Sequence, residues 1–194
     1  MHRIVGLFPI PVLETQIDNW ENCRQELFSH ITSADILIGS KKDDFVLASN
    51  TFTSVEILDS CPITKSTIES YLKIYAETIN VSRLTITNSW VSTYKYNEFI
   101  GTHHHLPKHV SGVMFLNDGF KGGNFFFDNP SVDMDNLLLS EKYSSFNEYT
   151  EPIHIVTPKA GNLIIFKAFM YHGTTPLISK TTRYTLAFNA MVSE

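Results

Sequence analysis

The sequence predicts a mainly β fold, either a β-sandwich or a jelly roll, with helices packed against it. Residues 15–33 and 66–79 place apolar side chains at helical spacing, whereas the chain after Asn80 contains about seven segments with strand patterns. Helices followed by a run of strands are typical of helices that buttress a layered β structure. The chain has 194 residues and no internal repeat or linker. We therefore expect one domain over residues 1–194, with a helical support region (1–80) and a jelly-roll core (81–194).

The N-terminal part of the chain combines strand and helix signals. Residues 4–13 are apolar and contain prolines, which predicts a short strand that runs into a turn. Residues 15–33 follow as an amphipathic helix, and a short strand is expected at 45–47 within a mixed stretch. A second helix is expected to begin near Ser66, because Ser66 and Glu69 have the spacing of a capping box.

Strand patterns dominate the rest of the chain. Apolar and polar side chains alternate in several segments that end at turn signals, which is the pattern of half-buried strands. The expected strands span residues 84–94, 110–116, 124–127, 153–156, 162–167 and 183–192. Residues 128–150, which are rich in Asp, Asn and Ser, form a long loop between two of them. Because loops of this length are usually functional or disordered, we expect a lid or specificity loop there.

Composition excludes several classes of partner. A formal net charge of −5 without any run of Lys or Arg argues against a nucleic-acid partner, and no apolar run is long enough to cross a bilayer. Cys23 and Cys61 lie far apart without a Cys-x-x-Cys motif, which favours a reducing compartment. Pro9 and Pro11 interrupt the apolar N-terminal stretch, so we expect a cytoplasmic protein rather than an exported one. The oligomeric state is open.

A histidine tract follows the first long strand. It contains His103, His104, His105 and His109 within seven positions. Side chains alternate in direction along an extended chain, so His103 and His105 should face one side and His104 the other. Two imidazoles at positions i and i+2 can share a metal ion. A short histidine tract is equally compatible with a solvated turn, and His109 is expected in a loop.

A second group of candidate site residues lies near the C-terminus. His172 follows an apolar strand and precedes a glycine, where a loop can direct an imidazole inward. Arg183 opens the last strand, and its planar guanidinium suits a carboxylate that accepts two hydrogen bonds. No carboxylate lies close to it in the sequence. A ligand could supply one, or Arg183 could form a structural ion pair with Asp128 or Glu98.

These motifs resemble the Fe(II)/2-oxoglutarate-dependent oxygenases, in which His-x-Asp/Glu is followed by a distal His and then by an Arg. Here His172 follows His103 by 69 residues and Arg183 follows His172 by 11. Tyr94 precedes His103 by nine residues, as in the prolyl-hydroxylase-like branch. A group of bacterial and viral members is especially similar. The motifs that carry this similarity are Trp90, His103-x-His105, Ser111-Gly112-Val113, Phe127-Asp128-Asn129-Pro130 and Arg183 to Asn189.

The resemblance implies a double-stranded β-helix that couples oxidative decarboxylation of 2-oxoglutarate by O₂ to hydroxylation of a substrate. The substrate would be a small molecule or a peptide, such as an amino acid or a prolyl residue. Arg183 would bind the distal carboxylate of 2-oxoglutarate, with Thr185 or Tyr94 as hydrogen-bond partner. The side chains that would hold Fe(II) are His103, His105 and His172.

Position 105 departs from the wider superfamily, because most members have Asp or Glu there. His105 would complete a three-histidine site, or a water molecule would take its place on the metal. Since a potential ligand is kept, hydroxylation is expected rather than halogenation. One alternative is a cupin-like three-His dioxygenase without 2-oxoglutarate, which explains His105 but leaves Arg183 unexplained. Another is a non-catalytic jelly-roll binding or viral accessory domain in which the histidine tract is incidental.

Overall fold

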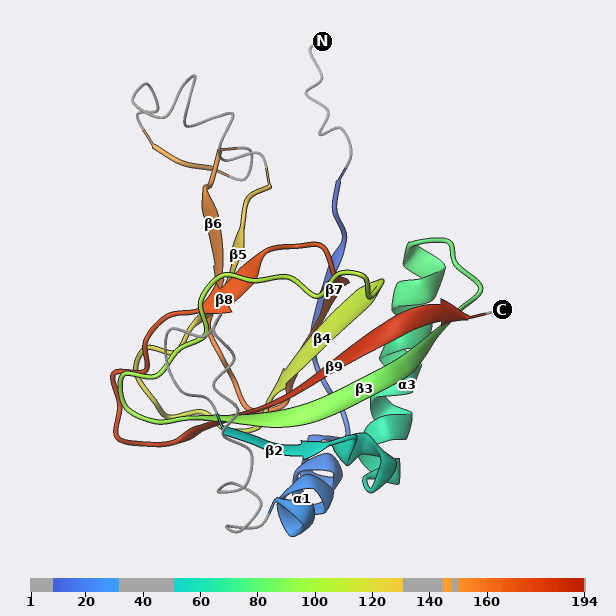
Figure 1. The fold of residues 1–194 in the computed structure, drawn as a ribbon, viewed down its shortest axis with the longest axis horizontal. Helices are drawn as coiled ribbons and strands as arrows, with labels where there is room; N and C mark the ends of the chain where they lie inside the picture. Colours follow the sequence, from blue (N-terminus) through green and yellow to red (C-terminus); the bar gives the residue numbers. More distant parts are fainter. Residues whose placement is uncertain (1–8, 32–50, 131–144, 148–149, 194) are drawn as a thin grey trace.

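The computed structural model describes residues 9–31, 51–130, 145–147 and 150–193 (Figure 1). Its strands are β1 (Val12–Gln16), β2 (Thr51–Val55), β3 (Arg83–Tyr94), β4 (Val110–Phe115), β5 (Phe125–Asp128), β6 (Ile153–Val156), β7 (Asn162–Lys167), β8 (His172–Thr174) and β9 (Arg183–Ser193). Within the described residues they form two sheets whose neighbouring strands are antiparallel. The six-stranded sheet has the order β1-β7-β4-β9-β3-β2, and the three-stranded sheet has the order β6-β5-β8.

The helices pack on one face of the six-stranded sheet (Figure 1). They are α1 (Trp20–His30), the short 3₁₀ helix η1 (Ile57–Asp59) and α3 (Pro62–Thr78). The cluster they share with the sheet includes Cys23 and Leu27 of α1 and Ile68, Leu72 and Tyr75 of α3. Among the described residues, no helix is both long and apolar enough to cross a membrane.

The opposite face of the six-stranded sheet packs against the three-stranded sheet. Strand β7 shows how the alternation of side chains divides the two cores. Leu163 and Ile165 face the helices, whereas Ile164 and Phe166 belong to the cluster between the sheets. Phe125 and Phe127 of β5 complete that second cluster from the other side. The space between the sheets is therefore largely aromatic, and it is where the candidate site lies.

The predicted fold class is confirmed, since the protein is a mainly β, two-sheet jelly roll supported by helices. Several boundaries differ from the sequence-based expectation. Strand β1 extends to Gln16, so the first helix begins at Trp20 rather than at residue 15. Strands β2 and β8 were not predicted. The strand expected at 45–47 and most of the 128–150 loop lie outside the described residues, and the single-domain division stays a prediction.

The start of α3 corrects the capping-box prediction. The helix begins at Pro62, four residues before Ser66. Its first backbone N–H groups are capped by Glu26 of α1: Oε1 accepts from Ile63 N–H at 2.9 Å, and Oε2 accepts from Thr64 N–H at 2.7 Å. These N–H groups have no partner within the helix, so a carboxylate from another element replaces a local cap. A cap so distant in sequence leaves no local pattern.

We expect Glu26→Gln to lower the free energy of unfolding by about 1–2 kcal/mol at pH 7. Burial alone would raise the pKa of Glu26, but the hydrogen bonds from Ile63 and Thr64 outweigh it and lower the pKa. A carboxyl group with a lowered folded-state pKa stabilises the fold above its unfolded pKa of about 4.3 and loses this contribution as the pH falls. Urea unfolding should therefore show the difference between wild type and variant shrinking below that pH.

Glu21→Gln on the same helix is the matched control. Its carboxylate makes only exposed contacts, at 3.4 Å to Arg24 and at 3.4 Å to Gln25, so the change should cost no more than about 0.5 kcal/mol. An equal loss of unfolding free energy in Glu26→Gln and Glu21→Gln would contradict a capping role for Glu26.

Candidate metal centre

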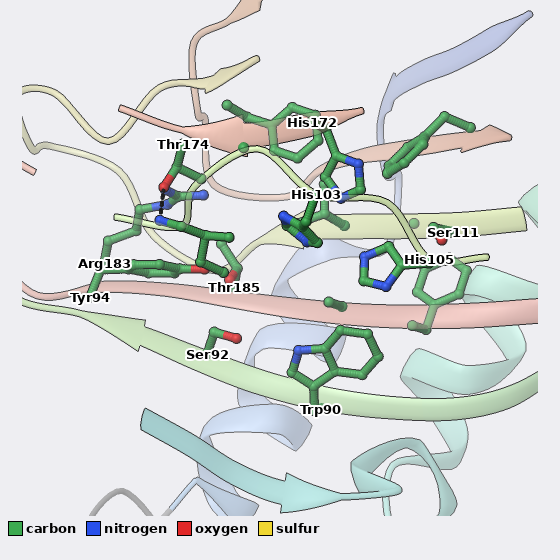
Figure 2. A pocket seen from close by; sticks show the side chains of 18 residues that line it. Trp90, Ser92, Tyr94, His103, His105, Ser111, His172, Thr174, Arg183 and Thr185 are labelled. Carbon is green, nitrogen blue, oxygen red and sulfur yellow. Dashed lines mark hydrogen bonds between the residues drawn. The ribbon is translucent and has the colours of Figure 1, made fainter. Parts of the chain in front are cut away.

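The three candidate ligands come from two chain segments that lie side by side (Figure 2). His103 N–H donates to His172 C=O at 2.9 Å, and His172 N–H donates to His103 C=O at 3.0 Å. His105 N–H donates to Ala168 C=O at 2.8 Å. These backbone bonds keep the histidine tract extended outside any regular strand. The predicted alternation therefore holds, and His103 and His105 face the same cavity.

The three imidazoles converge on one point. One ring nitrogen from each of His103, His105 and His172 lies within 4.8 Å of the other two. A metal ion bound at about 2.1 Å from each nitrogen needs similarly short separations. Phe125 and Phe166 pack against the His172 ring, with centroids 5.5 and 4.7 Å away, and this packing restricts its orientation.

Hydrogen bonds to backbone carbonyls fix the tautomer of two rings. His103 Nδ1 lies 2.9 Å from Gly101 O, and His172 Nδ1 lies 2.8 Å from Met170 O. A carbonyl oxygen can only accept, so Nδ1 carries the proton and Nε2 keeps its lone pair. Metal-binding histidines commonly use one nitrogen for such a bond and the other for the ion.

Burial keeps all three rings neutral at physiological pH. It lowers the pKa of His103, lowers the pKa of His105 to about 4, and lowers the pKa of His172 well below its ordinary value. The neighbouring histidines lower these pKa values further, because each additional proton would face another imidazolium. A neutral imidazole is the form that binds a metal ion.

Three other histidines, His104, His109 and His154, do not line the cavity. His104 is exposed and packs edge-to-face on Tyr171 with ring centroids 5.0 Å apart. His109 is exposed, and its Nδ1 accepts a hydrogen bond from Val192 N–H at 2.9 Å. His154 is exposed in β6, 3.5 Å from Glu151. His104 therefore faces away from the cavity, as expected, and neither His109 nor His154 lines it.

Arg183 occupies the other end of the same cavity (Figure 2). It is only 1% exposed, and its Nε and Nη1 atoms have no hydrogen-bond partner among the described residues. The guanidinium carbon lies 4.6 Å from the ring centre of Tyr94 and 5.5 Å from that of Phe115. Burial lowers the pKa of Arg183 to about 10, so it is still charged at pH 7. Neither Asp128 nor Glu98 accepts a hydrogen bond from Nε or Nη1 of Arg183, so these two atoms do not support the alternative of a structural ion pair.

Tyr94 and Thr185 lie beside Arg183, as the sequence motifs predicted. Both are buried, and the Tyr94 hydroxyl is within hydrogen-bonding reach of the Thr185 and Ser92 side chains. Burial raises the pKa of Tyr94, while Arg183 and the two hydroxyls oppose the rise. Tyr94 therefore keeps its proton at neutral pH and can donate it in a hydrogen bond.

Three polar wall residues were not recognised as site residues from the sequence: Ser92, Ser111 and Thr174. Ser92 stands between Trp90 and Tyr94 on the same face of β3, so period-two alternation could have found it. Ser111 Oγ donates to Asn189 Oδ1 at 2.7 Å, within the motifs already noted. Thr174 lies on β8, which had no strand signal. The cavity encloses about 50 Å³ of free space, room for a few water-sized groups.

These residues fit a divalent metal ion and a small organic acid. Three neutral imidazoles present lone pairs at one end, and a buried guanidinium with two unpaired donor atoms lies at the other. An unpaired buried charge is unfavourable, and a carboxylate would satisfy it. Fold and site together describe a jelly-roll protein with a candidate metal centre and a pocket suited to an anion.

The sequence shows the family. Residues 88–189 match the family described as "Putative 2OG-Fe(II) oxygenase", and the chain belongs to this family. The matched segment contains Tyr94, the three candidate metal ligands and Arg183. Its members depend on Fe(II) and 2-oxoglutarate (2OG). The resemblance drawn from the sequence motifs is thereby confirmed. No curated protein matches the chain.

Solved structures show the same fold. A prolyl-4-hydroxylase from Pseudomonas putida is 13% identical, with a TM-score of 0.64 over 95% of this chain and 94% of that chain. A prolyl hydroxylase from Trichoplax adhaerens, in complex with a hypoxia inducible factor peptide fragment, is 11% identical, with a TM-score of 0.64 over 93% and 83%. The chain spans 55% of the length of a 2OG-Fe(II) oxygenase family oxidoreductase from Burkholderia pseudomallei, with 14% identity, 66% of this chain covered and a TM-score of 0.49.

Proposed function

We propose that the protein is an Fe(II)- and 2-oxoglutarate-dependent dioxygenase that hydroxylates its substrate. The observation that carries this proposal is the position of Arg183, a buried cation with unpaired donors in the same cavity as three convergent imidazoles. A metal-binding protein that did not use an organic acid would have no need for that guanidinium. Family membership supports the reaction class.

In this proposal His103, His105 and His172 hold Fe(II) through the nitrogens that face the cavity. For His103 and His172 that nitrogen is Nε2, because Nδ1 is engaged by a backbone carbonyl. When bound, Fe(II) and 2OG would supply the oxidising chemistry: 2OG would lose CO₂ and take up one atom of O₂ to become succinate, and the other oxygen atom would be transferred to the substrate. The protein orients these groups and excludes water.

Arg183 binds the distal carboxylate of 2OG. Its planar fork can donate two hydrogen bonds to one carboxylate, and the rings of Tyr94 and Phe115 hold the guanidinium in place. Tyr94 and Thr185 lie close enough to serve as additional hydroxyl donors. The aromatic core between the sheets shields the pocket, which strengthens these charged interactions.

The substrate class we propose is an amino acid or a peptide, with a prolyl residue as the first candidate. Two observations support it: the chain shares its fold with prolyl hydroxylases, and Tyr94 has the spacing of that branch. The direct test is to incubate the protein with Fe(II), 2OG and O₂ and either proline-containing peptides or free amino acids. A product heavier by one oxygen atom, formed together with succinate, would identify the substrate.

The first experiment is a thermal-shift titration of metal-stripped protein with Mn(II), an oxygen-inert substitute for Fe(II), with and without 2OG. A ligand present at a hundredfold its dissociation constant adds about 2.7 kcal/mol to the free energy of unfolding. For a domain of this size that raises the melting temperature by roughly 5–10 °C. We expect Mn(II) to raise it and 2OG to raise it further only when Mn(II) is present.

A cupin-like dioxygenase that uses no 2OG is the second candidate, and the three-histidine cluster is the observation that favours it. The same titration distinguishes the 2OG-dependent dioxygenase from the cupin-like one. A shift with Mn(II) that 2OG does not increase would favour the cupin-like reaction. No shift with either ligand would mean that the cluster binds no metal, and it would support the non-catalytic alternative.

The cytoplasmic location expected from the sequence is also kept as a proposal. Its support is that Cys23 and Cys61 are both free and fully buried. Unpaired thiols are common where the compartment is reducing.

A further inference from the structure

No acidic side chain of the described residues lines the site cavity. Among the described residues that form its wall, Arg183 is the only fully charged one, and neither Asp nor Glu is present. The three histidines are neutral as metal ligands. The inference that follows rests on the proposed function, because it takes a divalent metal ion and 2OG as the occupants of this cavity.

The charges in the loaded cavity do not cancel. The metal ion contributes two positive charges, Arg183 contributes one, and the two carboxylates of 2OG contribute two negative charges. One positive charge is left in a pocket whose wall consists mainly of buried side chains. In a site with two histidines and one carboxylate the same count reaches zero, because the protein itself supplies the third negative charge.

We propose that the loaded cavity binds one further monoanion beside 2OG, because histidine occupies position 105. A net charge in a water-poor cavity is unfavourable unless a counter-charge accompanies it. The monoanion is either a free ion such as chloride or a carboxylate that belongs to the substrate. If it comes from the substrate, a free amino acid or a peptide with a nearby carboxylate is preferred over a neutral substrate.

Among the described residues, no acidic group in the cavity wall provides this charge. Glu98 is outside the cavity wall, half-buried, and its Oε2 accepts the Lys95 N–H at 2.7 Å. Burial raises the pKa of Tyr94 most, and the charge of Glu98 is the last of the causes that raise it. Asp128 ends β5 and follows Phe127, whose side chain faces the core, so the Asp128 side chain faces the opposite side of the sheet. Tyr94 is a neutral phenol at physiological pH. Since none of the described residues provides the counter-charge, we assign it to a ligand.

The test compares His105→Asp with His105→Asn in protein loaded with Mn(II) and 2OG. Asp and Asn have nearly the same shape and differ in charge. Thermal shifts are recorded during titration with sodium chloride and, separately, with sodium acetate. We expect a saturable rise in melting temperature for wild type and for His105→Asn. We expect His105→Asp to bind the anion at least about tenfold more weakly, since it adds a full negative charge at close range in a poorly solvated site.

A second comparison tests the proposal, should either His105 variant fail to fold. The anion-dependent rise must appear in wild type loaded with Mn(II) and 2OG and must be absent from metal-stripped Arg183→Met, whose cavity carries no charge. Metal-stripped wild type is not the control, because its unpaired Arg183 can itself bind an anion. A rise with both salts assigns the site to any small monoanion, whereas a rise with acetate alone assigns it to a carboxylate. Equal responses of loaded wild type and stripped Arg183→Met, or of the Asp and Asn variants, would overturn the proposal.

Failure of this inference can be distinguished from failure of the proposed function. The 2OG-dependent rise on Mn(II)-loaded wild type is measured first, without added chloride or acetate. Its absence would remove the proposed function and this inference together. Its presence, followed by no response to either anion, would remove only the second anion and leave the dioxygenase proposal standing.

Discussion

Replacing His172 with alanine is expected to abolish the stabilisation of the protein by Mn(II). His172 is only 4% exposed, is locked by its Nδ1 bond to Met170 C=O, and lies between the aromatic side chains of the inter-sheet core. Removing even an outer-shell partner of a metal ligand costs about 10–100-fold in affinity, and removing a ligand should cost more. The Mn(II)-dependent shift in melting temperature is the measurement.

His104→Ala is the matched control for this variant. His104 lies in the same histidine tract, but it is exposed and packs edge-to-face on Tyr171, outside the cavity wall. We expect its Mn(II)-dependent shift to be close to that of wild type. Because His172→Ala also leaves a hole next to Phe166, its melting temperature without metal should fall. The comparison therefore uses the increment on adding Mn(II), and a wild-type increment in His172→Ala would exclude His172 from the metal centre.

Local periodicity was enough to predict which neighbouring side chains of one segment face the same cavity. Alternation along an extended chain placed His103 and His105 on one side, and it grouped Arg183 with Thr185 on the last strand. Both predictions hold, because alternation depends only on an extended backbone. The histidine tract is not a regular strand, yet its backbone bonds to His172 and Ala168 keep it extended.

Features that depend on contacts distant in sequence could not be predicted in this way. Strand β8 has three residues and contains a glycine, so it exists because of its pairing with β5 rather than its own pattern. Gly112 belonged to a recognised motif, but its physical reason is visible only in the fold. It pairs with Phe188 across β4 and β9, and a Cβ atom at position 112 would overlap the Phe188 ring.

Replacing Arg183 with methionine is expected to separate ligand binding from fold stability. Without ligand, the change should leave the free energy of unfolding unchanged or raise it, because it replaces a buried cation with unpaired Nε and Nη1 atoms by an apolar side chain of similar length. With Mn(II) present, 2OG affinity should fall by about 1.5–3 kcal/mol, the loss expected for hydrogen bonds to a charged group. That is roughly a ten- to hundredfold change in dissociation constant.

Arg183→Lys is the matched control, since it keeps the positive charge but loses the planar fork. Its 2OG affinity should lie between those of wild type and Arg183→Met, and Mn(II) alone should stabilise all three proteins equally. Calorimetric titration of 2OG into Mn(II)-loaded protein, together with urea unfolding of the ligand-free proteins, measures both quantities. Unchanged 2OG affinity in Arg183→Met would remove Arg183 from the cosubstrate site. A large loss of stability without ligand would instead show that the guanidinium is a structural element, and the cation–π contacts with Tyr94 and Phe115 would then be its main role.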